Sequence, residues 1–514
     1  MLVKTYGSAV EGIHATIITV EVNVASGGQP GFFLVGLPDN AVREGRERIR
    51  TSFVHNGFYL PRRAITVNMA PADIIKVGSA YDLTVAVGVL AADGTISPKL
   101  LESYLIMGEL SLDGTLRPIK GALPIAIEAR KRGFQGMIVP APNAAEAAIV
   151  SELDVIPVEN LLEAVEFLDE RKTIEPLKRD TREIFFAAQE RFPFDFVDVR
   201  GQENVKRALE VAAAGGHNII LIGPPGAGKT MLAKRMPTIL PPLTLHEALE
   251  TTKIHSVAGV LPEDASLVAY RPFRSPHHTT SDVALVGGGG NPSPGEISMA
   301  HNGILFLDEL PEFKRQVLEV LRQPLEERRI TVSRARLTVE YPANFMMVAS
   351  MNPCPCGYFN HPERECVCGP PQVQRYLSKI SGPLLDRIDL HIEVTPVKFE
   401  ELAARPEGEK SATIQARVIQ ARDRQIARFD AHPGIYSNAM MPPNMVRQVC
   451  QIDEVSQNLL KTAMKKLDLS ARAFDRILKV ARTIADLAAK EQIEADHIAE
   501  AIQYRSLDRE SWGG

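Results

Sequence analysis

The chain has 514 residues, which at about 150 residues per domain corresponds to roughly three to four domains. Hydrophobic residues make up 45% of the chain and charged residues 24%, and these proportions exclude a disordered or fibrous protein. The net charge of −5 excludes a uniformly basic protein that coats nucleic acid, but it leaves room for a local basic surface.

The N-terminal region, residues 1–170, is predicted to be a mixed α/β domain. Thr16–Val24 and Ala64–Met69 are rich in β-branched residues, which favour strands, whereas Asp82–Ala92 has the pattern of a helix. Residues 171–197 carry many charges and two prolines, a composition typical of a linker.

Neither a targeting signal nor a membrane span is expected. Polar residues interrupt the N-terminal segment too often for the apolar core of a signal peptide. The longest apolar run, Leu83–Ala92, is too short to cross a bilayer. We therefore expect a cytoplasmic protein without a membrane partner.

The strongest motif of the chain is the sequence GPPGAGKT, within residues 198–396. It matches the phosphate-binding loop G-x-x-x-x-G-K-[ST], and it lies between a strand-like run, Asn218–Ile222, and a helix-like run. In such a loop backbone N–H groups and the lysine bind phosphates, and the final hydroxyl binds Mg²⁺. The predicted ATP-binding residues are Gly223, Pro224, Pro225, Gly226, Ala227, Gly228, Lys229 and Thr230.

Polar residues follow two further buried strands. The sequence GILFLDE ends in Asp308, predicted to bind Mg²⁺ together with Thr230, and in Glu309, predicted to orient and polarise the attacking water. A second apolar strand, Phe345–Ser350, leads to Asn352, whose side chain we expect to contact the γ-phosphate and the water. Together with the phosphate loop, these residues predict ATP hydrolysis.

Four cysteines crowd into a short segment with the spacing C-x-C-x₉-C-x-C. Two close pairs of thiolates suit tetrahedral Zn²⁺, although zinc ribbons usually have two residues between paired cysteines. The predicted structural zinc site consists of Cys354, Cys356, Cys366 and Cys368, and four reduced thiols without metal are the alternative.

Two arginines occupy notable positions in the rest of the chain. Arg387, in PLLDRID, follows a helix-like run and precedes a strand. Residues 410–514 are predicted to be mostly helical, and Ser470 is expected to cap the helix that carries Arg472.

The order of these motifs resembles that of AAA+ ATPases. In that family the first arginine reaches the nucleotide of the next subunit, and the second senses the nucleotide from a helical lid. The resemblance implies that Arg387 acts in trans and that Arg472 is the lid sensor. Arg476 is the alternative candidate for the lid sensor. A surface ion pair with the adjacent aspartate is the simpler interpretation of Arg387. The resemblance implies a homo-hexamer.

Longer stretches, such as RPFRSPHHTTSDVALVGGG and SGPLLDRIDLHIEV, resemble the Mg-chelatase-like ComM/YifB family from about residue 1 to residue 508. This resemblance implies an ATP-driven motor acting on single-stranded, forked or branched DNA, with branch migration or helicase activity when transforming DNA is integrated by homologous recombination. Related chelatase subunits help to insert Mg²⁺ into a porphyrin, so an ATPase that drives metal insertion with a partner complex is the alternative.

In this branch of AAA+ proteins two hairpins face the central pore. One is expected within the long insertion at 231–302, and the other at Arg329–Pro342. Arg334 and Arg336, near the tip of the second hairpin, are predicted to bind DNA phosphates without reading the sequence. Two solvated arginines are the alternative.

The N-terminal region resembles the proteolytic domain of Lon, which has a ribosomal S5-like fold, through GSAYDL and GELSLDGTLRPIKG. The catalytic serine and lysine of Lon align with Ala80 and Leu123, so we expect no proteolysis. The expected fold class is therefore α/β: an S5-like/Lon-protease-like α+β domain, a central AAA+ P-loop α/β domain and a C-terminal helical lid.

Overall fold

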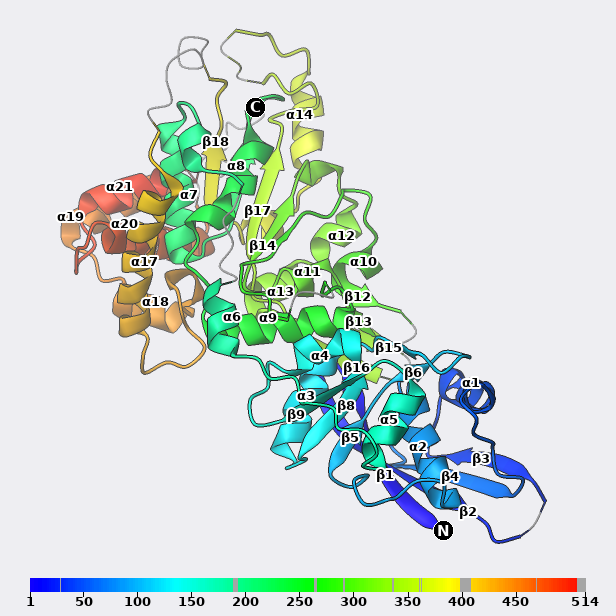
Figure 1. Cartoon of the computed structure of the whole chain (residues 1–514). Coiled ribbons are helices and arrows are strands. Elements are labelled where there is room, and N and C mark those ends of the chain that lie inside the picture. The colour runs from blue at the N-terminus through cyan, green and yellow to red at the C-terminus, as the bar shows by residue number, and fades with distance from the viewer. Residues whose placement is uncertain are drawn as a thin grey trace.

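The computed structural model describes residues 1–27, 29–187, 193–262, 266–289, 292–334, 337–359, 361, 363–397, 408–467 and 469–505. The chain is a mixed α/β protein with an N-terminal region built on one sheet, a central region built on a parallel sheet, and a C-terminal helical region beside the central one (Figure 1). None of the helices in these residues is long and apolar enough to cross a membrane.

The N-terminal region contains a seven-stranded sheet in the order β3-β4-β2-β1-β5-β8-β9. Alternation of apolar and polar residues determines which face of β2 is buried, and Ile18, Val20 and Val22 are fully inaccessible. The sheet strands are β1 (Leu2–Glu11), β2 (His14–Val24), β3 (Gly31–Val35), β4 (Ala64–Ala70), β5 (Tyr104–Ile106), β8 (Gly136–Pro140) and β9 (Asp154–Val158).

Helices and one small hairpin complete this region. Helix α2 is buried from Asp82 to Ala92, which confirms the helix predicted there, and it ends at Gly94 in the left-handed conformation. The elements are α1 (Asn40–His55), α2 (Asp82–Asp93), α3 (Ala122–Lys131), α4 (Ala141–Ala147), α5 (Leu161–Leu168), α6 (Thr181–Ala187), β6 (Glu109–Leu110) and β7 (Leu116–Arg117).

The central sheet has five strands in the order β11-β14-β17-β10-β18, and all neighbouring strands are parallel. Strands β10 and β14 are continuous apolar runs, as expected where helices cover both faces of the sheet. Since they are parallel, their carboxyl ends meet at one edge. The strands are β10 (Ile219–Ile222), β11 (Phe273–Arg274), β14 (Ile304–Leu307), β17 (Met346–Met351) and β18 (Leu390–Glu393).

The elements around this sheet include two further hairpins. They are α7 (Glu203–Gly215), α8 (Lys229–Arg235), α9 (Leu245–Ala258), α10 (Asp282–Val286), β12 (Gly287–Gly288), β13 (Ser293–Pro294), α11 (Glu296–Met299), α12 (Arg315–Glu319), α13 (Arg322–Glu327), β15 (Arg329–Arg334), β16 (Leu337–Pro342), α14 (Pro370–Leu377) and α15 (Gly382–Leu385).

The C-terminal region is helical, as predicted, and it packs against α7 of the central region. Ile477, Val480, Ala481 and Ile484 form the buried face of α20 and join the apolar core around α7 and β10. The helices are α17 (Ser411–Arg428), α18 (Pro443–Val449), α19 (Glu454–Lys466), α20 (Ala471–Leu487) and α21 (Ala495–Gln503).

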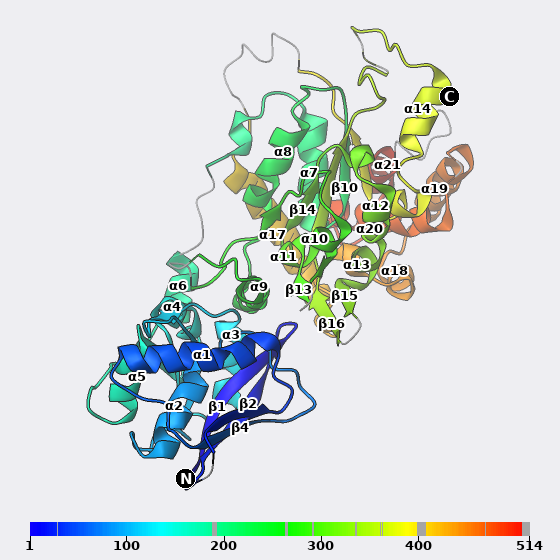
Figure 2. The same ribbon diagram turned by 90° about the vertical axis from the view of Figure 1, so that its right-hand side faces the viewer.

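Among the described residues, two contacts join the N-terminal region to the central region, and Figure 2 shows these parts of the chain from the side. At the first, α3 lies beside α9, and the Ser256 hydroxyl donates a hydrogen bond to the buried carboxylate of Glu146. At the second, the turn between β1 and β2 reaches the hairpin β15–β16. There Ile13, 8% exposed, belongs to the apolar cluster of the central region rather than to that of its own sheet.

Candidate ATP site and cysteine cluster

The phosphate loop follows β10 and turns sharply into α8. Gly226 and Gly228 have φ angles of +80° and +88°, a conformation that side chains with a Cβ rarely adopt. A Cβ on Gly223 would lie 2.2 Å from the carbonyl oxygen of Val394, which follows β18. Glycines are therefore required here by backbone conformation and by close packing.

Lys229 places its ammonium inside the loop. Nζ donates hydrogen bonds to the carbonyl oxygens of Gly223 at 2.7 Å and Pro224 at 2.9 Å, and to Oδ1 of Asn352 at 3.1 Å. Burial lowers the pKa of the Lys229 ammonium, and the carboxylates of Asp308 and Glu309 oppose that shift. The structure thus brings together Lys229 and Asn352, which lie 123 positions apart in the sequence.

Asp308 lies at the carboxyl end of β14, next to the phosphate loop. Its Oδ2 accepts a hydrogen bond from the Thr230 hydroxyl at 2.8 Å, and its Oδ1 accepts one from Ser350. Adjacent hydroxyl and carboxylate oxygens are the ligands that Mg²⁺ prefers, so the donor set fits this ion. Sequence reasoning missed Ser350, although its place at the end of an apolar run, two residues before Asn352, was a usable signal.

Glu309 has an unusual backbone conformation for a residue that is not glycine, with a φ angle of +53°. Its side chain is about half exposed, and Oε2 lies 3.7 Å from Nδ1 of His278. Glu309 and Asn352 line an open pocket of about 510 Å³ together with Arg375 of α14. The carboxylate therefore faces solvent at the edge of the sheet where Lys229 also lies.

Gln202, which the sequence analysis did not single out, binds the backbone of the phosphate loop. It has a left-handed conformation with φ of +57°, and its Nε2 donates to the carbonyl oxygens of Ala227 and Thr395, both at 3.0 Å. This side chain thus connects the loop to the segment that follows β18.

Arg387 is buried, at 6% exposure, in this single chain. Its guanidinium donates to the carbonyl oxygen of Pro383 and to the carboxylate of Glu326, which is itself half exposed. Its Nε is buried without a hydrogen-bond partner among the described residues. Burial lowers the pKa of Arg387, and Glu326 opposes that shift. The ion pair covers the group predicted to act on a neighbouring subunit.

The two arginines of α20 differ in their surroundings. Arg472 is 63% exposed and lies 3.6 Å from Asp386, next to Arg387 in the chain, whereas Arg476 forms an ion pair with the buried Asp389. Burial tends to raise the pKa of Asp389, but Arg476 and His217 together outweigh it and hold that pKa well below the usual range. Ser470 caps α20 by accepting a hydrogen bond from the Ala473 N–H, as predicted.

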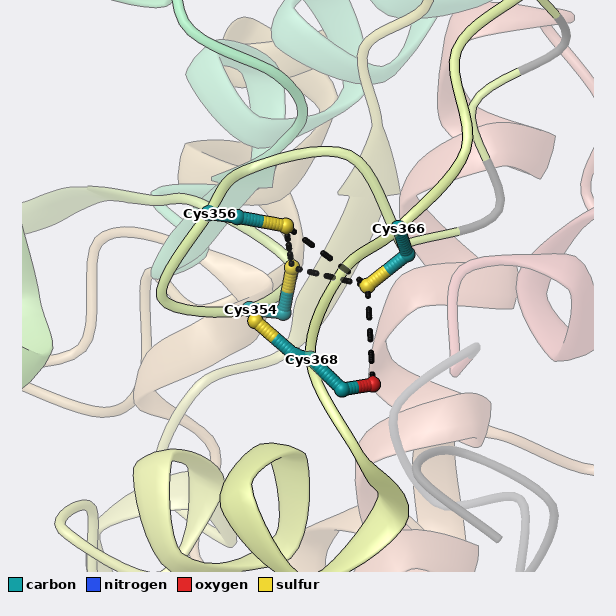
Figure 3. Close-up of side chains that lie close together, drawn as sticks. All are labelled: Cys354, Cys356, Cys366 and Cys368. Atoms are coloured by element: carbon teal, nitrogen blue, oxygen red, sulfur yellow. Dashed lines mark hydrogen bonds between the residues drawn. The ribbon is translucent and has the colours of Figure 1, made fainter.

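The four predicted cysteines come together in one cluster, whose sulfur atoms all lie within 4.8 Å of one another (Figure 3). The Sγ–Sγ distances are 3.3 Å between Cys354 and Cys356, 3.7 Å between Cys354 and Cys366, and 3.6 Å between Cys356 and Cys366. Tetrahedral Zn²⁺ with Zn–S bonds of about 2.3 Å places sulfurs about 3.8 Å apart, so the cluster fits this metal.

Backbone groups favour the thiolate of Cys356, whereas burial and the neighbouring thiols raise the pKa of Cys366 to about 12 and also raise that of Cys368. Burial raises the pKa of the Cys356 thiol, but hydrogen bonds from the N–H groups of Tyr358 and Val367 oppose burial, and the pKa falls to about 6. The thiolate is the form of cysteine that binds metal.

The predicted hairpin is present as β15 and β16, which pair from Arg329 with Pro342 to Arg334 with Leu337. Arg336 and the side chain of Arg334 lie outside the described residues. Midway along the hairpin, a Cβ on Gly12 would lie 2.9 Å from Cγ1 of Val339, so the β1–β2 turn of the N-terminal region packs tightly against β16.

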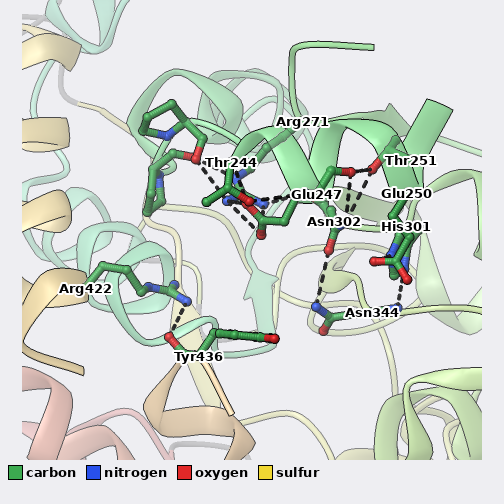
Figure 4. Close-up of polar contacts among 12 residues, drawn as sticks. Thr244, Glu247, Glu250, Thr251, Arg271, His301, Asn302, Asn344, Arg422 and Tyr436 are labelled. Carbon is green, nitrogen blue, oxygen red and sulfur yellow. Dashed lines mark hydrogen bonds and ion pairs between the residues drawn. The ribbon is translucent and has the colours of Figure 1, made fainter. Parts of the chain in front are cut away.

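The predicted insertion contains a short hairpin, β12–β13, and two arginines with partners within the chain. Arg274 forms two hydrogen bonds of 2.7 Å with Glu296. Arg271 donates to the carbonyl oxygens of Pro241 at 2.6 Å and of Asn302 at 2.7 Å, in the polar network of Figure 4. This network joins α9 to the turn that precedes β14.

Comparison with known proteins identifies the family. Magnesium chelatase, subunit ChlI, matches residues 195–402, and further ChlI profiles match residues 20–143 and 408–505. The chain is 44% identical over 504 residues to YifB of Salmonella typhimurium, covering 97% of this chain and 96% of that protein. It is 41% identical over 511 residues to the competence protein ComM of Haemophilus influenzae, covering 99% and 98% of the two chains.

A more distant relative is the 38 kDa subunit of magnesium chelatase from Rhodobacter capsulatus. It is 23% identical over 344 residues, which is 60% of this chain and 86% of that subunit. Identity to the YifB and ComM proteins is both higher and nearly complete in length. The chain therefore belongs to the YifB/ComM family of Mg-chelatase-type AAA+ proteins.

Proposed function

We propose that this protein is an ATP hydrolase that acts as a motor on DNA. The observation that carries the ATPase proposal is the convergence of Lys229, Asn352, Thr230 and Asp308 at one edge of the parallel sheet. In this proposal the phosphate loop with Lys229 binds the phosphates, and Thr230 and Asp308 hold Mg²⁺. Glu309 takes a proton from the attacking water, and Asn352 positions that water.

We propose that the DNA activity is branch migration or helicase activity during integration of transforming DNA. Support comes from the 41% identity to a competence protein and from the β15–β16 hairpin, whose tip carries Arg334 and Arg336 in the sequence. Contacts to phosphates would allow such a motor to act on any sequence.

A ring is part of this proposal, because Arg387 would act on the nucleotide of the next subunit in a homo-hexamer. Breaking its ion pair with Glu326 would free the guanidinium when subunits meet. Arg472, exposed beside Asp386, would sense the nucleotide state from the lid.

We propose the boundaries 1–170, 171–197, 198–396 and 410–514 for the domains, and an S5-like fold without proteolytic activity for the first. Ser79, the serine nearest the position of the Lon nucleophile, donates a hydrogen bond to the carboxylate of Glu109. A carboxylate cannot lower the pKa of a serine as a neighbouring lysine does, which supports a non-proteolytic domain.

The alternative is an ATPase that drives metal insertion with a partner complex. The similarity to the chelatase subunit supports this alternative, but at 23% identity it is weaker than the similarity to ComM. ATP turnover measured alone and with single-stranded, duplex or forked DNA separates the two functions. We expect stimulation by DNA. Turnover that none of these DNAs changes would count against the motor.

A further inference from the structure

The cysteine cluster adjoins the ATP site, and three contacts link the two. The first is with the phosphate loop. Gly357 is buried between Cys356 and Tyr358, with φ of +85°, and a Cβ there would lie 2.6 Å from Cδ of Pro225. The backbone of the cysteine segment therefore packs directly against the loop that binds phosphates.

The second contact involves Asn352, which lies two positions before the fully buried Cys354. The chain leaves Asn352, forms the cluster, and returns through α14, where Tyr376 lines the same pocket as Asn352. Both ends of the cysteine segment thus lie at the pocket lined by the residue whose side chain binds Lys229.

The third contact is the pocket itself. Pro355, between the first two cysteines, lines the same pocket as Glu309 and Asn352. When a bound Zn²⁺ is removed, the thiolates take up protons and the four metal–sulfur bonds that tie the two halves of the segment together are lost, so the segment can change its shape. Any change in that shape reaches Pro225 and Asn352 through packed backbone.

We propose that Zn²⁺ bound by Cys354, Cys356, Cys366 and Cys368 braces the phosphate loop and couples zinc occupancy to ATP affinity. The proposal rests on the ATP site proposed above. Because coupling between two sites is reciprocal, zinc should tighten ATP binding by the same factor by which ATP tightens zinc binding. A factor of about 5 to 150 is typical of coupled sites.

The test uses the full-length protein and a fluorescent ATP analogue in the presence of Mg²⁺. Elemental analysis of protein purified without added zinc should find about one Zn²⁺ per chain. After removal by a chelator, the Kd for the analogue should rise at least about fivefold, and added Zn²⁺ should restore it. In the reciprocal measurement, a non-hydrolysable ATP analogue should slow the release of zinc to the chelator.

Two glycine substitutions separate the packing contact from the metal ligands. Gly357→Ala keeps all four thiols but drives a methyl group into Pro225, so it should weaken nucleotide binding. Gly434→Ala is the matched control, because Gly434 has a similar φ of +91° and no atom of the described residues lies within 4 Å of the place that its Cβ would occupy. The control should bind nucleotide like the parent.

The outcomes are distinct. Unchanged nucleotide affinity after zinc removal, or in Gly357→Ala, would overturn the coupling, and so would a folded protein purified without zinc that binds ATP tightly. A zinc-loaded protein that binds no ATP would instead refute the proposed ATPase. Cys354→Ser should lose both zinc and affinity, and the chelation experiment tests the same point if that variant does not fold.

Discussion

Replacing Glu309 by glutamine tests the chemistry most directly, because the change removes a base and little else. The side chain is about half exposed, and its Oε2 lies 3.7 Å from Nδ1 of His278. The backbone N–H of Glu309 donates to Oδ1 of Asp308 at 3.1 Å, and the substitution leaves both of these groups in place. Lys229 and Thr230 keep all their contacts, so ATP binding should change by less than about threefold.

Loss of a general base typically slows a reaction by about 100-fold to 10,000-fold, or about 3 to 5 kcal/mol in the activation barrier. We therefore expect kcat of Glu309→Gln to fall within that range while the Kd for ATP is nearly unchanged. Steady-state phosphate release measures the first quantity, and a fluorescent ATP analogue measures the second.

Glu312 provides the matched control for this experiment. It lines the same pocket three positions away, and it pairs with Lys379 at 3.3 Å on the surface. Such exposed pairs contribute about 0 to 1 kcal/mol, so Glu312→Gln should turn over ATP within about twofold of the parent. Glu309→Gln turning over at the parent rate would refute the role assigned to Glu309.

Three further predictions concern assembly, DNA and coupling between regions. Arg387→Ala should retain ATP binding and lose turnover. Subunits that carry this change should recover some activity when they are mixed with Lys229→Ala subunits. The absence of recovery in oligomers of verified mixed composition would exclude action in trans. Replacing Arg334 and Arg336 by alanine should flatten the salt dependence of DNA binding and reduce DNA-stimulated turnover more than basal turnover. Unchanged DNA binding in this double variant would show that the DNA-binding site lies outside the hairpin. Ile13→Ala should lower the free energy of unfolding by about 2 to 5 kcal/mol, because this side chain fills the core under β15–β16. Chemical denaturation measures that loss, and a change below about 0.5 kcal/mol would show that the β1–β2 turn is not anchored there.

Local sequence patterns determined most of the secondary structure and the motifs. The apolar runs before the phosphate loop, before Asp308 and before Asn352 are strands, because a parallel sheet covered on both faces requires continuous apolar segments. The sequence also predicted the clustering of the four cysteines, because residues so close along the chain cannot lie far apart in space.

Tertiary structure decided which of these residues meet. The strand order places β17 between β14 and β10, so Asn352 reaches Lys229, and Ser350 reaches Asp308; neither contact is encoded by spacing along the chain. Only the fold shows that Arg387 is covered by Glu326 in the single chain.

The same holds for contacts between regions. Gly12 and Gly357 appear in the sequence as ordinary turn residues, yet each lies where a methyl group would collide with another part of the chain, Val339 or Pro225. The sequence shows that a glycine can adopt conformations that other residues avoid. Whether the position also requires the absence of a side chain depends on which segment packs against it. That neighbour comes from a distant segment, so only the tertiary structure reveals it.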